Sequence, residues 1–195
     1  MPYDAGMNRI AARRPGPNET TSDYQRRMID RIEGEDCLAV AAGQLYWLCE
    51  LASHLAPMVV DTIHRPHRWT IRQVFAHGID VERIFGARMT HAAAGDATVL
   101  AGFDQDAYAD AKFGSGNFSN LTTEWGHLRQ SNLLLLQRLS PVCWDRTATI
   151  DGETMTVRAM AWFLAGHTQH HLQIVERRAG VSVDRLPPVQ PPVIT

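Results

Sequence analysis

The sequence lacks the cysteine pattern of a disulfide framework or a thiolate metal site. Its three cysteines, Cys37, Cys49 and Cys143, are odd in number and show no Cys-x-x-Cys spacing. This argues against structural disulfides and excludes a cysteine-rich zinc site. Cys49 lies in an apolar helical pattern, so we expect it to be a small core residue. Nothing electropositive near Cys143 marks it as a reactive thiol.

Long apolar runs and basic clusters are also missing. The longest apolar runs are far too short to span a bilayer, and the start, Met1-Pro2-Tyr3-Asp4, lacks the pattern of a signal peptide. The expected compartment is therefore the cytoplasm. The net charge of −2 without a block of Lys or Arg argues against nucleic acid or an anionic membrane surface as a partner.

The length of 195 residues suits one domain that buries a sizeable core without disulfides. Residues 1–22 are predicted to be an irregular N-terminal arm, because Pro and Gly interrupt any periodic pattern. Residues 181–195 form a Pro-rich tail that is expected to be extended. We therefore predict a single domain over residues 1–195.

Four segments have apolar residues at the three- and four-residue spacing of amphipathic helices. The first is predicted to follow an N-cap at Asp36 and to end by Ala56, because Pro57 disfavours helix before it. The second begins after Thr70, which is a suitable N-cap.

The third helix is predicted to start near Ser119 or Asn120 and to be stopped by Pro141. The fourth follows a cap at Thr154 or Thr156 and ends near Gly180. Four helices of this length and no series of strands predict an all-α fold, a four-helix bundle.

Two connections add detail to this bundle. Residues 95–118 are rich in Gly and Asp and predict a long crossover with one short helix near 105–111. Asp151-Gly152 lies between two extended runs and predicts a two-stranded hairpin.

Three histidines occupy apolar helical faces. His167 and His171 lie one turn apart on the fourth helix, and His77 lies on the apolar face of the second. Buried imidazole nitrogens need partners. One possibility is a core histidine bonded to a backbone carbonyl, and the other is a metal ion, for which neutral imidazole is the commonest ligand. His64 and His67 fall in an Arg-Pro context that favours a solvated loop.

Facing helices of a bundle can bring His77 to His167 and His171, which would form a mononuclear site with open coordination positions. Asp80 and Glu82 are either hydrogen-bond acceptors behind such a site or surface charges. Arg158 is a candidate substrate anchor. Trp69, Trp162 and the glycine-rich crossover are candidate cavity walls; the alternative for both Trp residues is that they only fill the core.

Three segments in order resemble the DinB-like superfamily, in its branch of YfiT-type metal-dependent hydrolases and thiol S-transferases. They are WTIRQVFAHGIDVER (69–83), LAGFD (100–104) and VRAMAWFLAGHTQHH (157–171). Residues 14–19 together with Tyr24 also resemble the N-terminal arm of that branch, so the similarity covers nearly the whole chain.

The resemblance implies a four-helix bundle, often a homodimer, with a divalent metal ion held by His77, His167 and His171. Zinc or nickel is expected first, with iron or manganese as alternatives, and His170 is expected to flank the site. Relatives include thiol S-transferases that use a low-molecular-weight thiol. We therefore expect a metal-dependent hydrolase or thiol S-transferase acting on a small-molecule substrate; the alternative is a non-catalytic metal-binding or dimerisation scaffold.

Overall fold

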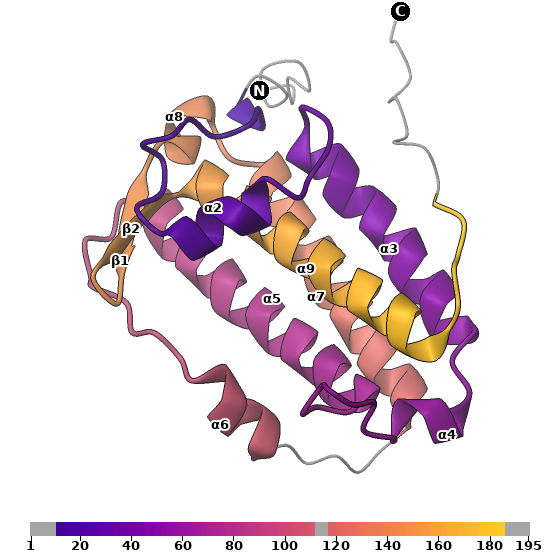
Figure 1. Cartoon of the computed structure of the whole chain (residues 1–195). Helices are drawn as coiled ribbons and strands as arrows, with labels where there is room; N and C mark the ends of the chain where they lie inside the picture. The colour runs from indigo at the N-terminus through magenta and orange to yellow at the C-terminus, as the bar shows by residue number, and fades with distance from the viewer. Residues whose placement is uncertain (1–10, 112–116, 186–195) are drawn as a thin grey trace, which may run out of the picture.

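Four long helices form a bundle in the computed structural model of the protein, which describes residues 11–111 and 117–185. They are α3 (Cys37–Ser53), α5 (Ile71–Ala94), α7 (Phe118–Gln137) and α9 (Val157–Ala179) (Figure 1). The shorter elements are α2 (Asp23–Ile29), α4 (Pro57–Val60), α6 (Gln105–Asp110), α8 (Pro141–Trp144), β1 (Thr147–Ile150) and β2 (Glu153–Thr156). The predicted all-α four-helix bundle is confirmed.

Each long helix packs against two others. α3 and α5 both contact α7 and α9, so α3 lies diagonally across the bundle from α5. α5 and α7 run in the same direction, since Phe75 packs on Phe118 near their starts while Glu82 meets Asn132 further along both helices. The chain between them therefore crosses the length of the bundle and includes α6 on the way (Figure 1). This is the predicted long crossover.

The predicted helix caps are largely confirmed. Asp36 accepts hydrogen bonds from two backbone N–H groups at the start of α3, and Thr70 forms a capping box with Gln73 at the start of α5. Thr156 caps α9 through the backbone N–H of Ala159. Gly180 ends α9 with a φ of 66°, a left-handed conformation that suits glycine.

Two details of α7 and its end differ from expectation. α7 begins at Phe118 because the side chain of Asn117, rather than Ser119 or Asn120, accepts the capping hydrogen bond. Pro141 does not lie at the end of α7; it occupies the first turn of the short helix α8. A proline is tolerated there because its missing N–H would have no helical partner.

The hairpin forms where Asp151-Gly152 predicts it. Asp151 and Gly152 have φ values of 49° and 81°, and Ile150 pairs with Glu153 on the other strand. The crossover is attached to this hairpin, since the backbone N–H of Leu100 donates to the carbonyl of Thr149 over 2.9 Å. The hairpin and the start of the crossover thus form one continuous layer beside α5.

Cys49 is exposed, which corrects the expectation that it fills the core. Trp47, Leu48 and Leu51 occupy the buried face of α3 and are 4%, 2% and 0% exposed. Cys49 lies between them in sequence but on the opposite side of the helix. Apolar neighbours in the sequence therefore did not predict the burial of Cys49 correctly, because its position on the helix directs it away from the core.

The N-terminal arm is irregular over its described residues and is held firmly on α9. The indole N–H of Trp162 donates to the carbonyls of Ala12 and Arg13, and Arg158 pairs with Glu19 over 2.7 Å. Trp162 is fully buried beneath the arm. Neither Trp162 as a cavity wall nor Arg158 as a substrate anchor is supported, because both side chains are used to attach the arm.

The remaining predictions concern the C-terminal tail, the number of domains and membrane-spanning helices. In the described part of the tail, residues 181–185, no helix or strand forms, and residues 186–195 lie outside the described residues, as do 1–10 of the arm. The single domain over residues 1–195 stays a prediction. Among the described residues, none of the helices has both the length and the apolar character needed to cross a bilayer.

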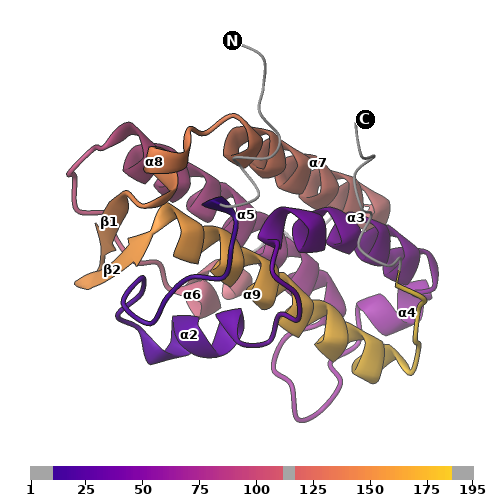
Figure 2. The ribbon, with the colours of Figure 1, turned by 90° about the horizontal axis from the view of Figure 1, so that it is seen from above.

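Close packing of α2 on α9 depends on a glycine next to the histidine pair. α2 packs against α9 and lies beside it when the bundle is viewed from above (Figure 2). A Cβ atom on Gly166 would lie 1.9 Å from the backbone oxygen of Met28 and 2.6 Å from its carbonyl carbon. Backbone atoms cannot rotate away as a side chain could, so any side chain at position 166 would displace α2.

We therefore expect Gly166→Ala to destabilise the protein by about 1–3 kcal/mol or more, as overpacking does. Gly126→Ala is the matched control, because a Cβ at this position in α7 meets nothing within 4 Å. That control should gain about 0.5–1 kcal/mol from the better helix propensity of alanine. Urea unfolding of both variants measures the difference, and equal stability of the two would contradict this view of the α2–α9 contact.

Candidate metal centre

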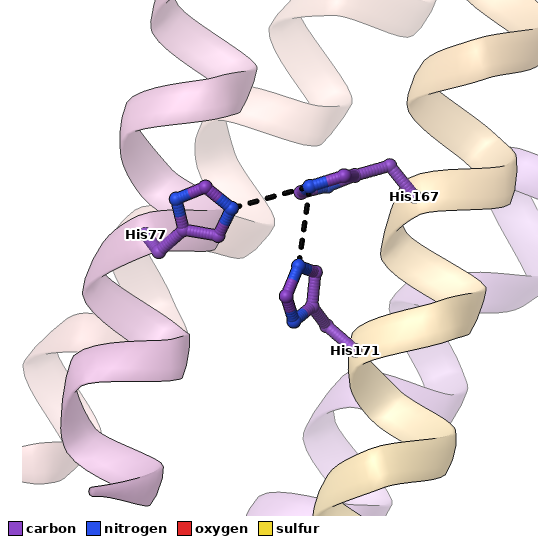
Figure 3. A group of neighbouring side chains, drawn as sticks. All are labelled: His77, His167 and His171. Carbon is purple, nitrogen blue, oxygen red and sulfur yellow. Dashed lines mark hydrogen bonds between the residues drawn. The ribbon is translucent and has the colours of Figure 1, made fainter. Parts of the chain in front are cut away.

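The three histidines that were predicted to bind a metal ion lie close together inside the bundle (Figure 3). His77 comes from α5, and His167 and His171 come from successive turns of α9. The Nε2 atom of His167 lies 3.2 Å from Nε2 of His77 and 3.1 Å from Nε2 of His171. His77 and His167 are buried and His171 is partly buried. The structure therefore brings together the three side chains that the sequence singled out.

Hydrogen bonds alone cannot satisfy this arrangement. A ring nitrogen of a neutral imidazole has either one N–H or one in-plane lone pair. Nε2 of His167 faces two other Nε2 atoms, so it can make a good hydrogen bond with one of them but not with both. In addition, Nδ1 of His171 is buried and has no hydrogen-bond partner among the described residues. A cation among the three nitrogens would remove the conflict.

The protonation state of the cluster suits a cation. Burial lowers the pKa of His167 and of His171 well below 6.5, and the neighbouring imidazoles lower it further. Both rings are therefore neutral at pH 7. Nitrogens bound to one tetrahedral zinc ion at 2.0–2.1 Å lie about 3.3 Å apart, close to the distances of 3.1 and 3.2 Å found here. These two distances match a zinc site, and all three ligand nitrogens lie within 4.8 Å of one another, so the donor set is compatible with a divalent metal ion.

The other candidate histidines stay outside the cluster. The ring of His170 lies 5.2 Å from that of His171 and is half-buried on the flank of α9, as expected. His64 lies in a loop, where its Nε2 contacts the carbonyl oxygen of Val59 at 2.9 Å. The loop interpretation of His64 and His67 is thus supported.

A cavity of about 610 Å³ opens beside His77 and His167. Its walls are formed by α2, by one face each of α5 and α9, by residues 102–106 of the crossover and by the hairpin turn. The crossover therefore lines the site, as expected. Trp69 packs its ring 5.0 Å from that of His77. Another cavity, of about 530 Å³ between α5 and α7, includes none of the three histidines.

A buried ion pair behind the cluster was not predicted. Glu82 is 1% exposed, and its carboxylate contacts the guanidinium of Arg129 at 2.6 Å. The carboxylate also accepts hydrogen bonds from Trp125 and Asn132. Burial raises the pKa of Glu82, while Arg129 and the two hydrogen bonds oppose that shift. The sequence left two roles open for Glu82, a hydrogen-bond acceptor behind the site or a surface charge, and the second is wrong.

The pair also reaches the helix that holds two of the histidines. Arg129 donates a hydrogen bond to the hydroxyl of Thr168, the residue next to His167. The sequence did contain a signal, because Trp125, Arg129 and Asn132 recur at helical spacing on one stripe. A charged residue on such a stripe indicates a buried partner on another helix.

The fold and the site together define a class: a four-helix bundle with a long crossover and three histidines contributed by its second and fourth long helices. Residues 45–175 match the family model of the DinB superfamily. The chain belongs to the DinB superfamily.

The fold is similar to that of a solved structure. YfiT from Bacillus subtilis superposes with a TM-score of 0.68 at 19% sequence identity, covering 88% of this chain and 99% of that one. That protein is described as a probable metal-dependent hydrolase with an unusual four-helix bundle topology. At this identity the similarity establishes the fold. A search of curated proteins finds no match.

We expect Glu82→Gln to destabilise the protein by about 3–5 kcal/mol, because Arg129 would keep a buried charge without its counter-ion. Glu124→Gln is the matched control, since Glu124 pairs with Arg83 on the surface and such pairs contribute at most about 1 kcal/mol. Adding Arg129→Met to Glu82→Gln should recover part of the loss. Denaturant unfolding tests this; similar losses at Glu82 and Glu124 would refute a structural role for the buried pair.

Proposed function

We propose that the protein is a metal-dependent enzyme that activates a water molecule or a small thiol. His77, His167 and His171 would hold a divalent cation, zinc or nickel first and iron or manganese as alternatives. The observation that carries the proposal is the convergence of three imidazole nitrogens, two of them on rings that burial keeps neutral, around one nitrogen that cannot form a good hydrogen bond to both of the others. Family membership and the description of YfiT as a probable metal-dependent hydrolase support it.

The chain supplies the orientation of the ligands. The ring of His77 packs between Trp69 and Phe103, with ring centroids 5.0 and 6.4 Å away, and the ring of His167 packs on Phe163 at 5.6 Å. These aromatic contacts restrict rotation of the imidazoles. Phe103 and Phe163 also border the cavity, so the side of the cluster that faces this space is lined by aromatic side chains.

A divalent cation bound by neutral ligands keeps its full charge and acidifies a coordinated water or thiol. The cavity has room for a small molecule beside His77 and His167. These features favour either hydrolysis of an ester or amide, or transfer of a thiol to an electrophilic carbon. The small-molecule substrate, a low-molecular-weight thiol co-substrate and a homodimer remain predictions.

The second candidate function is a metal-binding or dimerisation scaffold without turnover. Ligand spacing reports coordination and not chemistry, so the histidine cluster by itself fits both functions. The cavity favours the enzyme, because a closed structural site needs no adjacent space for a substrate.

Removing one histidine should abolish tight metal binding. We expect His77→Ala to weaken zinc binding by at least about a hundredfold, more than the loss of a group that only supports a ligand. His170→Ala is the matched control, since it removes a neighbouring imidazole outside the cluster. Calorimetric titration and elemental analysis measure affinity and stoichiometry. Full zinc stoichiometry in His77→Ala would eliminate this residue as a ligand.

Turnover distinguishes the two candidate functions. A screen of ester hydrolysis and thiol transfer with the zinc- and nickel-loaded protein should find activity that His167→Ala loses and His170→Ala keeps. The reason is that His167 both belongs to the cluster and borders the cavity. Activity that survives His167→Ala undiminished would remove the cluster from the mechanism. Metal binding with no turnover on either class of substrate would favour the scaffold.

A further inference from the structure

An arginine lies in the wall of the cavity that contains His77 and His167. Arg88 is 7% exposed and comes from α5, eleven residues after His77. At 100° per residue, this separation returns to nearly the same helix face. His77, Val81, Phe85 and Arg88 accordingly all border the cavity. One face of a single helix therefore presents both a proposed metal ligand and a buried guanidinium to the same space.

Arg88 differs from the other buried arginines in having no carboxylate partner. Three arginines are buried in the part of the chain that the structure describes. Arg129 contacts Glu82 at 2.6 Å, and Arg158 contacts Glu19 at 2.7 Å. Arg88 makes no ion pair within 4 Å among the described residues. A buried charge without a counter-ion is costly, so its retention calls for an explanation.

The contacts of Arg88 hold it in place but leave its charge available. One amino group donates to the carbonyl of Ala101 over 2.7 Å, and the guanidinium lies over the rings of Phe85 and Phe103, at 5.0 and 5.9 Å. A guanidinium has five N–H donors, of which this hydrogen bond uses one. Burial lowers the pKa of Arg88, an effect that the charge of Asp151 opposes.

The carboxylates in the cavity wall are mostly engaged elsewhere. Asp104 caps α6, Asp106 pairs with Arg68 at 3.9 Å, and Glu153 accepts a hydrogen bond from Gln25. Asp151 is exposed at the hairpin turn and interacts with Arg88 only at longer range. No wall residue in contact with Arg88 therefore neutralises it, and Asp151 is the one carboxylate that competes for it electrostatically.

We infer that Arg88 binds a carboxylate of the substrate or thiol co-substrate, so that the proposed enzyme acts on a small acid. The guanidinium carbon lies 5.9 Å from the ring of Phe103, which lies 6.4 Å from that of His77. The guanidinium carbon and the ring of His77 are thus no more than about 12 Å apart, so a small molecule bound at Arg88 can extend towards the histidines. A planar guanidinium recognises a carboxylate through two parallel hydrogen bonds. This inference rests on the proposed function.

The test compares adipate, a flexible dicarboxylate that can extend from Arg88 towards the histidines, with adipamide, its uncharged diamide. Binding is measured by calorimetry on the zinc-loaded protein and by ligand-observed NMR on the metal-free protein. We expect adipate to bind at least tenfold more tightly than adipamide in both forms. Arg88→Gln should weaken adipate binding about tenfold or more, as loss of a hydrogen bond to a charged group does, and leave adipamide binding unchanged.

Further variants keep the test specific. Arg88→Lys should lose less affinity than Arg88→Gln, because it keeps the charge but not the planar donor pair. Asp151→Asn should tighten adipate binding severalfold, because it removes the competing carboxylate. This gain should disappear when Arg88 is also replaced by Gln, whereas direct repulsion of adipate by Asp151 would give the same gain with and without Arg88. Arg83→Gln is the matched control, since Arg83 lies on the exposed side of the same helix in a surface pair with Glu124.

The outcomes separate this inference from the proposed function. If the protein binds none of zinc, nickel, iron and manganese but its preference for adipate depends on Arg88, the proposed function fails and the anion site stands. Zinc binding with equal adipate affinity in wild type and Arg88→Gln overturns the anion site alone, as does the absence of any preference for adipate over adipamide. If Arg88→Gln does not fold, Arg88→Lys and Asp151→Asn decide the question.

Discussion

The buried ion pair of Glu82 and Arg129 joins three of the four bundle helices. Glu82 belongs to α5, Arg129 to α7, and Arg129 continues to Thr168 on α9. Isolating either charge in the core would cost several kcal/mol, so the three helices are held in the one alignment that satisfies both. Since His167 precedes Thr168 in the chain, the same alignment also places His167 opposite His77.

Glycines beside two of the clustered histidines allow the close approach that this alignment needs. A Cβ on Gly78 would lie 2.4 Å from the ring of Trp125, and one on Gly166 would meet the backbone of Met28. Each glycine is a direct neighbour of a histidine, so the helix turn that presents an imidazole also packs against an adjoining helix without a gap. Rigidity of the imidazoles thus follows from backbone packing as much as from contacts of their own rings.

The local rules predicted the helices and the histidine cluster because the signals lie within single segments. Asp36, Thr70 and Gly180 act through neighbours in sequence, and the face of each histidine follows from helical spacing. Glu82 was a candidate hydrogen-bond acceptor, but its ion pair with Arg129 was not predicted, since burial of a charge depends on a partner 47 positions away. The position of Arg88 in the cavity wall likewise depends on where the crossover and the hairpin fold back over α5, which no local pattern specifies.

Because α5 and α7 are parallel, the segment that joins them is long and forms part of the cavity wall. The link between two parallel helices has to return along the whole bundle, and here its path runs past the histidines and supplies residues 102–106 to the cavity. Most of the hydrophobic core belongs to the helices, although Ala148, Ile150 and Met155 of the hairpin contribute to it. Much of the cavity wall belongs to this link and to the hairpin, which are joined by a backbone hydrogen bond. Changes in the sequence of this link can therefore alter which molecules fit the cavity, while the helix bundle and its three imidazoles stay unchanged.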